Sequence, residues 1–362
     1  MIYSVGCDID KQTIHVCLLS YDLPHQTHQV LSRKSFRNNE SGSKAFIKWV
    51  RRSVNDDSAA VRCTMEATGV YHEQLAIYVF DHHQDIRVSV VLPSASKKYI
   101  TSRGLRSKTD KVDAYGLALM GSERKLPKWK GIDRYWRELR QLTRTRAALQ
   151  EQITQLSSQL HAQTHSGLRV EVAEQSLQAS LTVLSEQRDR LTRQITVHLN
   201  SRKEMARQLA CLDSIPGIGM LTIAVILAET NGFEYFRSCS QLMSFSGYDV
   251  VANDSGQRVG KRKISKQGSS HIRRAMYMPA STIVRRKPPV LYDYYNRLLS
   301  RQAIKMKAHV ALQKKLLSYM YYLWKSQQLY SPDTYEHTQK RLQKKIAPHD
   351  GGATVDTSHA VA

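Results

Sequence analysis

One long stretch in the middle of the chain does most to limit the possible folds. From about residue 132 to 210, glycine and proline nearly vanish, and leucine or isoleucine recurs at the short intervals of an amphipathic helix. The residues in this pattern are Leu139, Leu142, Leu149, Ile153, Leu156 and Leu160, then, after a break near 165–167, Leu177, Leu181, Leu184, Leu191 and Ile195. The spacing predicts two long helices that fold back as a hairpin or pair with another subunit, with an ordinary helical-bundle core as the alternative.

The regions on either side of this stretch differ from it and from each other, which divides the chain into four parts. At 362 residues the chain is long enough for two or three domains with their own cores. We expect an α/β domain, a helical coiled-coil hairpin, a mainly helical C-terminal domain and a largely disordered tail. Their predicted bounds are 1–130, 131–205, 206–330 and 331–362.

Strands and helices alternate in the N-terminal part, as they do in α/β domains. The predicted strands cover residues 3–9, 13–20, 60–69 and 86–93, and the predicted amphipathic helices cover 44–54 and 71–83. The last of these strands is almost wholly apolar, which predicts a central strand buried on both faces of a sheet.

The charge of the chain indicates the kind of partner that it binds. Lys and Arg number 54 against 31 Asp and Glu, which gives a formal net charge of +23. An excess of this size favours polyanions, and nucleic acid is the simplest of them. The longest strongly apolar run, 221–228, is far shorter than the roughly 20 residues of a membrane-spanning helix. We therefore expect a nucleic-acid partner and no membrane.

Cysteine usage and the N-terminus both predict a cytoplasmic protein. The charged residues Asp8, Asp10 and Lys11 stand where a signal peptide would need its apolar stretch. The five cysteines, none of them in a C-x-x-C pair, are Cys7, Cys17, Cys63, Cys211 and Cys239. This odd number without a paired motif indicates reduced thiols and disfavours a disulfide framework or a zinc knuckle.

Four carboxylates form a candidate metal site. Asp8 and Glu66 end two predicted strands, where α/β folds place their chemistry. Asp110 and Asp113 are three positions apart at the start of a predicted helix, so both lie on one helix face. Four hard oxygen donors of this kind suit Mg²⁺ or Mn²⁺, and two such ions can clamp the reacting oxygens of a phosphodiester.

Each carboxylate also has an ordinary interpretation. Asp113 can be a charge that favours the start of a helix, and Glu66 can be a surface residue. Asp10 is as good a candidate as Asp8 for the first position, because the two share a face if the strand continues straight.

Three N-terminal motifs, in this order, resemble the DEDD-type insertion-sequence transposases related to the pilin-gene invertase. They are GCDIDKQTIHV, MEATGVY and GLRSKTDKVDAYGLA, and the C-terminal segments LDSIPGIGMLTIAVILAE and ISKQGSSHIRRAMYMPA are similar to that family as well. The resemblance covers most of residues 3–325. Cys7 stands where the family usually has an aliphatic residue, and residues 248–254 lack a proline often found there, which leaves the subgroup open.

The resemblance implies a fold, a site and a mechanism. The fold is an RNase H-like (RuvC-like) N-terminal domain, and the acidic tetrad falls on Asp8, Glu66, Asp110 and Asp113 with two divalent cations. The serine nucleophile of the family falls on Ser255, which by local sequence alone is an unremarkable loop serine. The implied reaction is strand cleavage through a covalent phosphoserine, followed by exchange and rejoining without an external energy source.

The resemblance also implies partners. Members of the family use a structured non-coding bridge RNA to choose target and donor DNA, and they work as dimers that pair into tetramers on double-stranded DNA. A transposase of this kind would act at the nucleoid.

Two other functions remain open: a structure-selective nuclease that hydrolyses with water, or a non-catalytic nucleic-acid-binding protein. A DNA invertase of the same family is a further possibility.

Two C-terminal features are candidate contacts with nucleic acid. Gly217 and Gly219 lie between two predicted helices and match a helix-hairpin-helix turn, in which backbone N–H groups approach phosphates. A plain tight turn is the alternative. A dense run of cations follows, and as phosphate contacts it would position the duplex without reading sequence, unless it is merely a solvated loop. Its members are Arg258, Lys261, Arg262, Lys263, Lys266, Arg273 and Arg274.

A pair of histidines is a weaker signal. His161 and His165 have the i, i+4 spacing of zinc-binding histidines. They lie in the leucine-patterned stretch, without a glutamate between them or an evident third ligand, so we interpret them as structural or solvent-facing.

Overall fold

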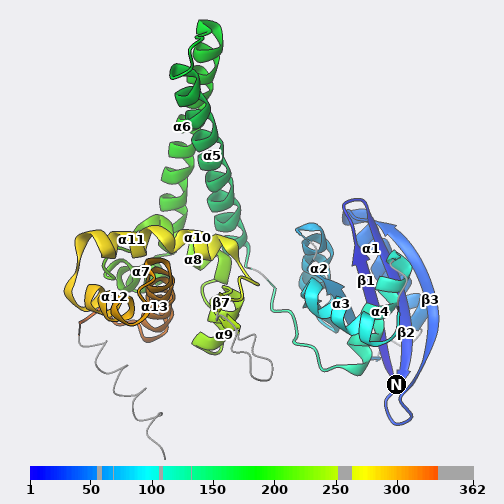
Figure 1. The fold of residues 1–362 in the computed structure, drawn as a ribbon. Helices are drawn as coiled ribbons and strands as arrows, with labels where there is room; N and C mark the ends of the chain where they lie inside the picture. Colours follow the sequence, from blue (N-terminus) through cyan, green and yellow to red (C-terminus); the bar gives the residue numbers. More distant parts are fainter. Residues whose placement is uncertain (55–58, 68, 106–108, 132, 252–262, 333–362) are drawn as a thin grey trace, which may run out of the picture. The chain divides into compact units, whose positions relative to one another are not determined.

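The chain forms two compact units, residues 1–132 (unit 1) and 133–362 (unit 2) (Figure 1). The computed structural model describes residues 1–54, 59–67, 69–105, 109–131, 133–251 and 263–332. The predicted tail, 331–362, therefore lies almost entirely outside the described residues. Among the residues that are described, no helix has both the length and the apolar character needed to cross a membrane.

The described part of unit 1 is built on a five-stranded mixed sheet (Figure 1). Its strands are β1 (Ile2–Ile9), β2 (Thr13–Asp22), β3 (Thr27–Arg37), β4 (Val61–Glu66) and β5 (Ile86–Val91). They lie in the order β3-β2-β1-β4-β5, with β2 antiparallel to β1 and β3, and with β1, β4 and β5 parallel. This mixed sheet with flanking helices fits the RNase H-like fold expected for the N-terminal part.

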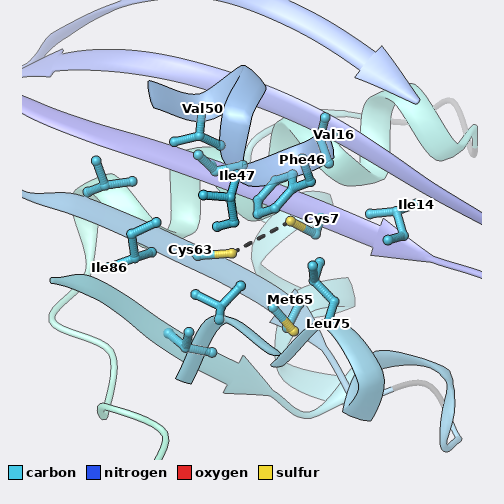
Figure 2. Packing of buried hydrophobic residues seen from close by; sticks show 14 of the residues in the cluster. Cys7, Ile14, Val16, Phe46, Ile47, Val50, Cys63, Met65, Leu75 and Ile86 are labelled. Atoms are coloured by element: carbon cyan, nitrogen blue, oxygen red, sulfur yellow. Dashed lines mark hydrogen bonds between the residues drawn. The ribbon is translucent and has the colours of Figure 1, made fainter. Parts of the chain in front are cut away.

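Helices cover both faces of the sheet, and the alternation of side chains along β1 separates the two faces. The helices are α1 (Glu40–Val54), α2 (Tyr71–His82), α3 (Pro93–Ser102) and α4 (Asp110–Glu123). Val5, Cys7 and Ile9 of β1 join the core with α1 and α2, which is drawn in Figure 2 around the neighbouring thiols of Cys7 and Cys63. The opposite face packs against α3 and α4 in a second core.

Two elements of the sheet differ from the expectation. The apolar strand β5 was expected at the centre but ends the sheet. It is buried nevertheless, because helices cover its faces and the amide of Trp129 donates to the carbonyl of Val88 at its outer edge, at 2.8 Å. At the other edge, β3 was not expected at all, because its side chains are mostly exposed and lack the alternation of a half-buried strand.

Helix α4 lies directly on β1 because the contact between them is made of small residues. A Cβ atom at Gly6 would lie 2.0 Å from the carbonyl oxygen of Ala114 and 2.3 Å from the amide nitrogen of Ala118. The hydroxyl of Ser4 donates to the carbonyl of Ala118 at 2.6 Å. At the far end of the helix, a Cβ at Gly121 would collide with the Ser4 and Thr64 hydroxyls. These contacts fix the axial position of α4 on the sheet.

Unit 2 begins with the two long helices that the leucine spacing predicts, α5 (Arg134–Thr164) and α6 (Glu171–Asn200), which form a hairpin (Figure 1). Near its base the rings of Tyr135 and His198 stack at 4.4 Å between centroids. Higher up, Arg146 Nε donates to Thr192 Oγ1 at 3.0 Å. The hairpin is thus present in one chain, whereas pairing as a coiled coil with a second subunit stays a prediction.

Further helices, all shorter than those of the hairpin, and a small strand pair complete the described part of unit 2. They are η1 (Lys203–Met205), α7 (Ala206–Asp213), α8 (Met220–Thr230), α9 (Cys239–Phe245), β6 (Val250–Val251), β7 (Lys263–Ile264), α10 (Ser270–Ala275), α11 (Tyr277–Arg286), α12 (Pro289–Gln302) and α13 (Lys305–Ser326). An ion pair joins the hairpin to this region: the partly exposed Arg144 donates two hydrogen bonds, of 2.8 and 3.0 Å, to the buried Glu229 of α8. Burial raises the pKa of Glu229, but Arg144 outweighs it and holds that pKa below its usual value.

We expect Gly6→Ala to destabilise unit 1 by about 1–3 kcal/mol or more, because the new methyl group would meet helix backbone that cannot rotate away. Urea unfolding of the full chain measures the loss. Gly167→Ala is the control, because a Cβ there has nothing within 4 Å. Equal stability of the two variants would contradict the close contact between α4 and β1.

Candidate active site

The parallel strands β1 and β4 bring Asp8 and Glu66 to the same edge of the sheet. Cys7 lies opposite Met65 in the register, and Asp8 and Glu66 each follow one residue later. Both point to the α4 face, because the residues beside them, Cys7 and Met65, belong to the core on the other face. Ser96 of α3 is fully buried, and its hydroxyl donates to Glu66 Oε2 at 2.6 Å.

The start of α4 supplies the other two carboxylates. Thr109 caps the helix, with its side-chain oxygen accepting from the amide of Val112 at 3.3 Å. Asp110 and Asp113 lie in the first turn, where the positive end of the helix dipole favours negative charge. Ala114 lies against Gly6, and the later residues Ala118 and Gly121 lie against Ser4, so α4 runs along β1 away from Asp8 and its first turn, with Asp113, is the part nearest Asp8.

The pKa of Asp8 is affected by the charges of the other three carboxylates. Burial, and then the charges of Asp113, Asp110 and Glu66, raise the pKa of Asp8 from 3.8 to about 6. The three acidic groups act on Asp8 although they come from a different strand and from a helix far along the chain. The fold therefore concentrates negative charge at this point.

A divalent cation fits this site by the chemistry of its donors. Carboxylate oxygens are the ligands that Mg²⁺ and Mn²⁺ prefer. Burial is the first cause of the raised pKa of Asp8 and the charges of its neighbours are the second, and a bound cation would offset those charges. The positions of the described side chains, in contrast, do not form a complete binding site. Within the described ranges, no three His, Cys, Asp or Glu side chains are arranged to hold one ion together.

Asp10, the alternative first carboxylate, has a different role. Its Oδ1 accepts from the amides of Gln12 and Thr13, both at 2.6 Å, in the turn between β1 and β2. These backbone hydrogen bonds hold the pKa of Asp10 below its usual value. Asp10 thus stabilises the turn. Asp8 is the one of the two whose pKa is affected by the other three carboxylates.

Two polar residues at the site were not identified from the sequence. His15 of β2 lies directly opposite Asp8 in the register, and its Nε2 is 3.3 Å from Asp110 Oδ2. Ser35 of β3 lies directly opposite His15, with its Oγ 3.0 Å from His15 Nδ1. A signal for His15 existed in the sequence: it alternates with the apolar Ile14 and Val16, and a tight turn near residue 11 would pair it with Asp8.

Ser255, together with Arg258, Lys261 and Arg262, lies in the segment 252–262, outside the described residues. The ends of that segment are held together, because β6 and β7 pair with Val250 opposite Ile264 and Val251 opposite Lys263. Just before β6, the fully buried Tyr248 donates its hydroxyl to Gln313 of α13 at 2.8 Å.

The described members of the cationic run differ in their surroundings. Lys263 and Lys266 are exposed. Arg273 is partly committed to the protein, because its Nη1 donates to the carbonyls of Ser246, Gly268 and Ser269, at 2.9 to 3.2 Å. Arg274 is exposed and forms an ion pair with Glu151 of the hairpin.

The glycines of the turn between α7 and α8 also differ. Gly217 has a φ of +81°, and a Cβ there would lie 3.1 Å from the carbonyl oxygen of Pro279, so the turn itself needs glycine. Gly219 is the N-cap of α8, and a Cβ there would meet nothing within 4 Å. The open side of the turn therefore lies at Gly219, beside the N-terminus of α8.

His161 and His165 close the end of α5. Their ring centroids lie 4.2 Å apart, and His165 Nδ1 is 2.8 Å from the carbonyl oxygen of His161. No third ligand joins them within the ranges that the structure describes.

Comparison with protein families finds two models along the chain. A model described as transposase matches residues 5–166, and a model of the IS116/IS110/IS902 family of transposases matches residues 209–296. The chain is 27% identical over 318 residues to the pilin gene-inverting protein of Moraxella bovis, which covers 88% of this chain and 94% of that protein. It is 28% identical over 146 residues to a 43.6 kDa protein of insertion element IS110 from Streptomyces coelicolor. That match covers 40% of this chain and 35% of the Streptomyces protein.

Two solved structures are similar to about a third of the chain. The RuvC structure of Thermus thermophilus matches at 9% identity with a TM-score of 0.28, covering 35% of this chain and all of RuvC. The Holliday junction resolvase of fowlpox virus matches at 16% identity with a TM-score of 0.25, covering 34% of this chain and 99% of the resolvase.

The raised pKa of Asp8 predicts a pH-dependent gain in stability for Asp8→Asn. The folded-state pKa, about 6, lies above the unfolded value of 3.8, so the native carboxyl loses stability as the pH rises through this window. Asn removes this loss. Allowing for partial exposure, we expect a gain of about 1–2 kcal/mol at pH 7.5 and none at pH 4.

Thermal unfolding in buffer with a chelator measures the difference. Asp22→Asn is the matched control, because the hydrogen bond from His25 lowers the pKa of Asp22, so its removal should not stabilise. A gain for Asp8→Asn that is equal at both pH values would contradict the repulsion among the carboxylates.

Proposed function

Because the chain belongs to the IS116/IS110/IS902 family of transposases, we propose that it is the recombinase of an insertion sequence, which cleaves and rejoins DNA strands. The observation that supports the proposal is that Asp8 and Glu66 end neighbouring parallel strands, and that the charges of Asp113, Asp110 and Glu66 act together with burial to raise the pKa of Asp8. A cluster of carboxylates at the end of a sheet suits metal-assisted phosphodiester chemistry.

The four carboxylates would hold two divalent cations, Mg²⁺ or Mn²⁺. When bound, these ions supply positive charge to the phosphodiester and make the attacking oxygen more acidic. The protein residues fix the donors. β1 and β4 hold Asp8 and Glu66 at a common edge, α4 presents Asp110 and Asp113, and Ser96 restrains Glu66. Removal of the ions should therefore stop cleavage without unfolding the chain.

Ser255 is the proposed nucleophile. In this step its Oγ forms a bond to phosphorus while a bridging P–O bond breaks, so the serine loses a proton and the departing strand oxygen gains one. Rejoining reverses the step with a new strand and conserves the energy of the ester. The resemblance of residues 253–256 to the family supports this assignment, and the pairing of β6 with β7 holds the ends of the segment that carries Ser255.

Double-stranded DNA is the proposed partner of unit 2 as well as of the active site. The exposed Lys263 and Lys266, with Arg258, Lys261 and Arg262 in the segment between the strands, would bind phosphates. Gly219 would let a phosphate approach the N-terminus of α8 across the open side of its turn, as in a helix-hairpin-helix motif. Arg273 and Arg274 would contribute through the donors that their protein partners leave available.

The remaining parts of the proposal concern assembly. We assign residues 1–130 to the metal-binding domain, 131–205 to a hairpin that assembles subunits, and 206–330 to the domain of the serine. The family resemblance supports a dimer that forms a tetramer on DNA, guided by a bridge RNA, at the nucleoid in the cytoplasm. The net charge of +23 is compatible with binding RNA as well as DNA, and sequencing of copurifying RNA tests this part.

One observation favours a related alternative. Two relatives that this chain matches over most of their length are described as pilin gene-inverting proteins, which favours DNA inversion as the alternative to insertion. A nuclease that uses water is the other alternative, and it shares the carboxylates but needs no serine.

We expect Ser255→Ala to abolish the covalent protein–DNA adduct and to lower strand cleavage by a factor of at least about 10³. The substrate is a duplex spanning the junction of the element with its flanking DNA, incubated with Mg²⁺ and the protein with its copurified RNA. Denaturing gels report the adduct and the cut strand. Asp8→Asn should lose both signals, whereas Ser176→Ala, an exposed serine on α6, should keep both. Full cleavage by Ser255→Ala without an adduct would instead support the nuclease.

A further inference from the structure

A row of polar side chains crosses three strands of unit 1 on the α4 face. Asp8 of β1 lies opposite His15 of β2, and His15 lies opposite Ser35 of β3. Directly opposed residues in antiparallel strands point to the same face, so the row follows from the register alone. The row therefore starts at Asp8, beside the other proposed metal ligands.

His15 connects this row to α4. Its Nε2 lies 3.3 Å from Asp110 Oδ2, and its Nδ1 lies 3.0 Å from Ser35 Oγ. The His15 side chain is 23% exposed, whereas that of Asp110 is 63% exposed. The His15 ring is therefore held by its surroundings, whereas the more exposed side chain of Asp110 is free to change its rotamer unless another residue holds it.

The contacts assign a role to each ring nitrogen. A carboxylate oxygen only accepts, so Nε2, which lies within ion-pair distance of Asp110 Oδ2, would have to carry the hydrogen in order to donate to it. In the neutral ring Nδ1 then accepts, and the hydroxyl of Ser35 is placed to donate to it. A histidine held in one tautomer by a second hydrogen bond is a familiar support for a carboxylate or a metal ligand.

Asp110 needs such support because of where it lies. It is the first residue of α4, at an exposed position, and its negative charge acts on the carboxyl of Asp8. The cap at Thr109 fixes the backbone at the start of the helix but not the side-chain rotamer of Asp110. A donor on the neighbouring strand supplies that second restraint.

We propose that His15 is a positioning residue for the divalent-metal site: it holds Asp110 Oδ2, so that the second oxygen of Asp110 serves the cation, and Ser35 holds the ring. This rests on the proposed function. His15 lies outside the four carboxylates, and it acts through Asp110 without touching DNA or the reacting atoms.

Binding of Mn²⁺ to the full-length chain without nucleic acid tests the inference, with free Mn²⁺ followed by electron paramagnetic resonance. We expect His15→Ala to weaken Mn²⁺ binding by about 10-fold, at the lower end of the effect of such supporting partners. His15→Gln, whose amide N–H can stand in for Nε2–H, should stay within about 3-fold of wild type. Ser35→Ala should lose about 3-fold.

Two controls separate positioning from folding. His25 makes a comparable contact, with Nδ1 2.9 Å from Asp22 Oδ2, but it lies near the β2–β3 turn away from the carboxylates, so His25→Ala should bind Mn²⁺ like wild type. Thermal unfolding with a chelator reports on each fold. Rescue of the affinity by His15→Gln at unchanged thermal stability supports positioning.

The outcomes distinguish this inference from the proposed function. If wild type shows no Mn²⁺ binding that Asp8→Asn removes, the metal site itself is wrong, and the inference fails with it. If Asp8→Asn removes binding while His15→Ala binds like wild type, only the role of His15 is overturned. The same holds if His15→Gln binds as weakly as His15→Ala, because the donated hydrogen bond would then have no effect.

Discussion

The close contact between helix α4 and strand β1 is the constraint on which the candidate site depends. Gly6 has no side chain to hold the helix away, so the backbone at Ala114 and Ala118 lies directly on the strand. The next residue of β1 on the same face is Asp8, and the residue before Ala114 is Asp113. A larger residue at Gly6 would move the start of the helix, and with it two of the four carboxylates. The packing of small residues thus determines where the negative charge gathers.

That gathering has an energetic cost which the surrounding structure only partly offsets. Burial of Asp8, and then the charges of the other three carboxylates, raise the pKa of Asp8. The first turn of α4 favours Asp110 and Asp113, the hydroxyl of Ser96 restrains Glu66, and His15 contacts Asp110. Unfavourable electrostatics of this kind are common at sites that bind a cation or carry out chemistry, because such sites are adapted to function and not to maximal stability.

Unit 2 uses buried polar contacts for a different purpose, which is to connect elements that are distant in sequence. Arg144 of α5 and the almost fully buried Glu229 of α8 anchor the hairpin, because an unpaired charge at this depth would be costly. The hydroxyl of Tyr248 reaches Gln313 of α13 and so holds the chain just before β6. The described chain is therefore held on either side of residues 252–262, and Ser255 is assigned from the sequence resemblance alone.

The sequence by itself determined the elements whose patterns are local. The leucine spacing from 132 to 210 is enough for the two hairpin helices. The positions of Asp8, Glu66, Asp110 and Asp113 at element ends make them candidates, but it was the family resemblance that favoured Asp8 over Asp10. Only the tertiary structure decided what depends on register and contact between distant segments. β5 ends the sheet, where the amide of Trp129 donates to its Val88 carbonyl, and β3 is an exposed strand that pairing alone reveals. His15 belongs to the site because the β1–β2 register places it opposite Asp8, and a periodic pattern contains no information about which strand is the neighbour.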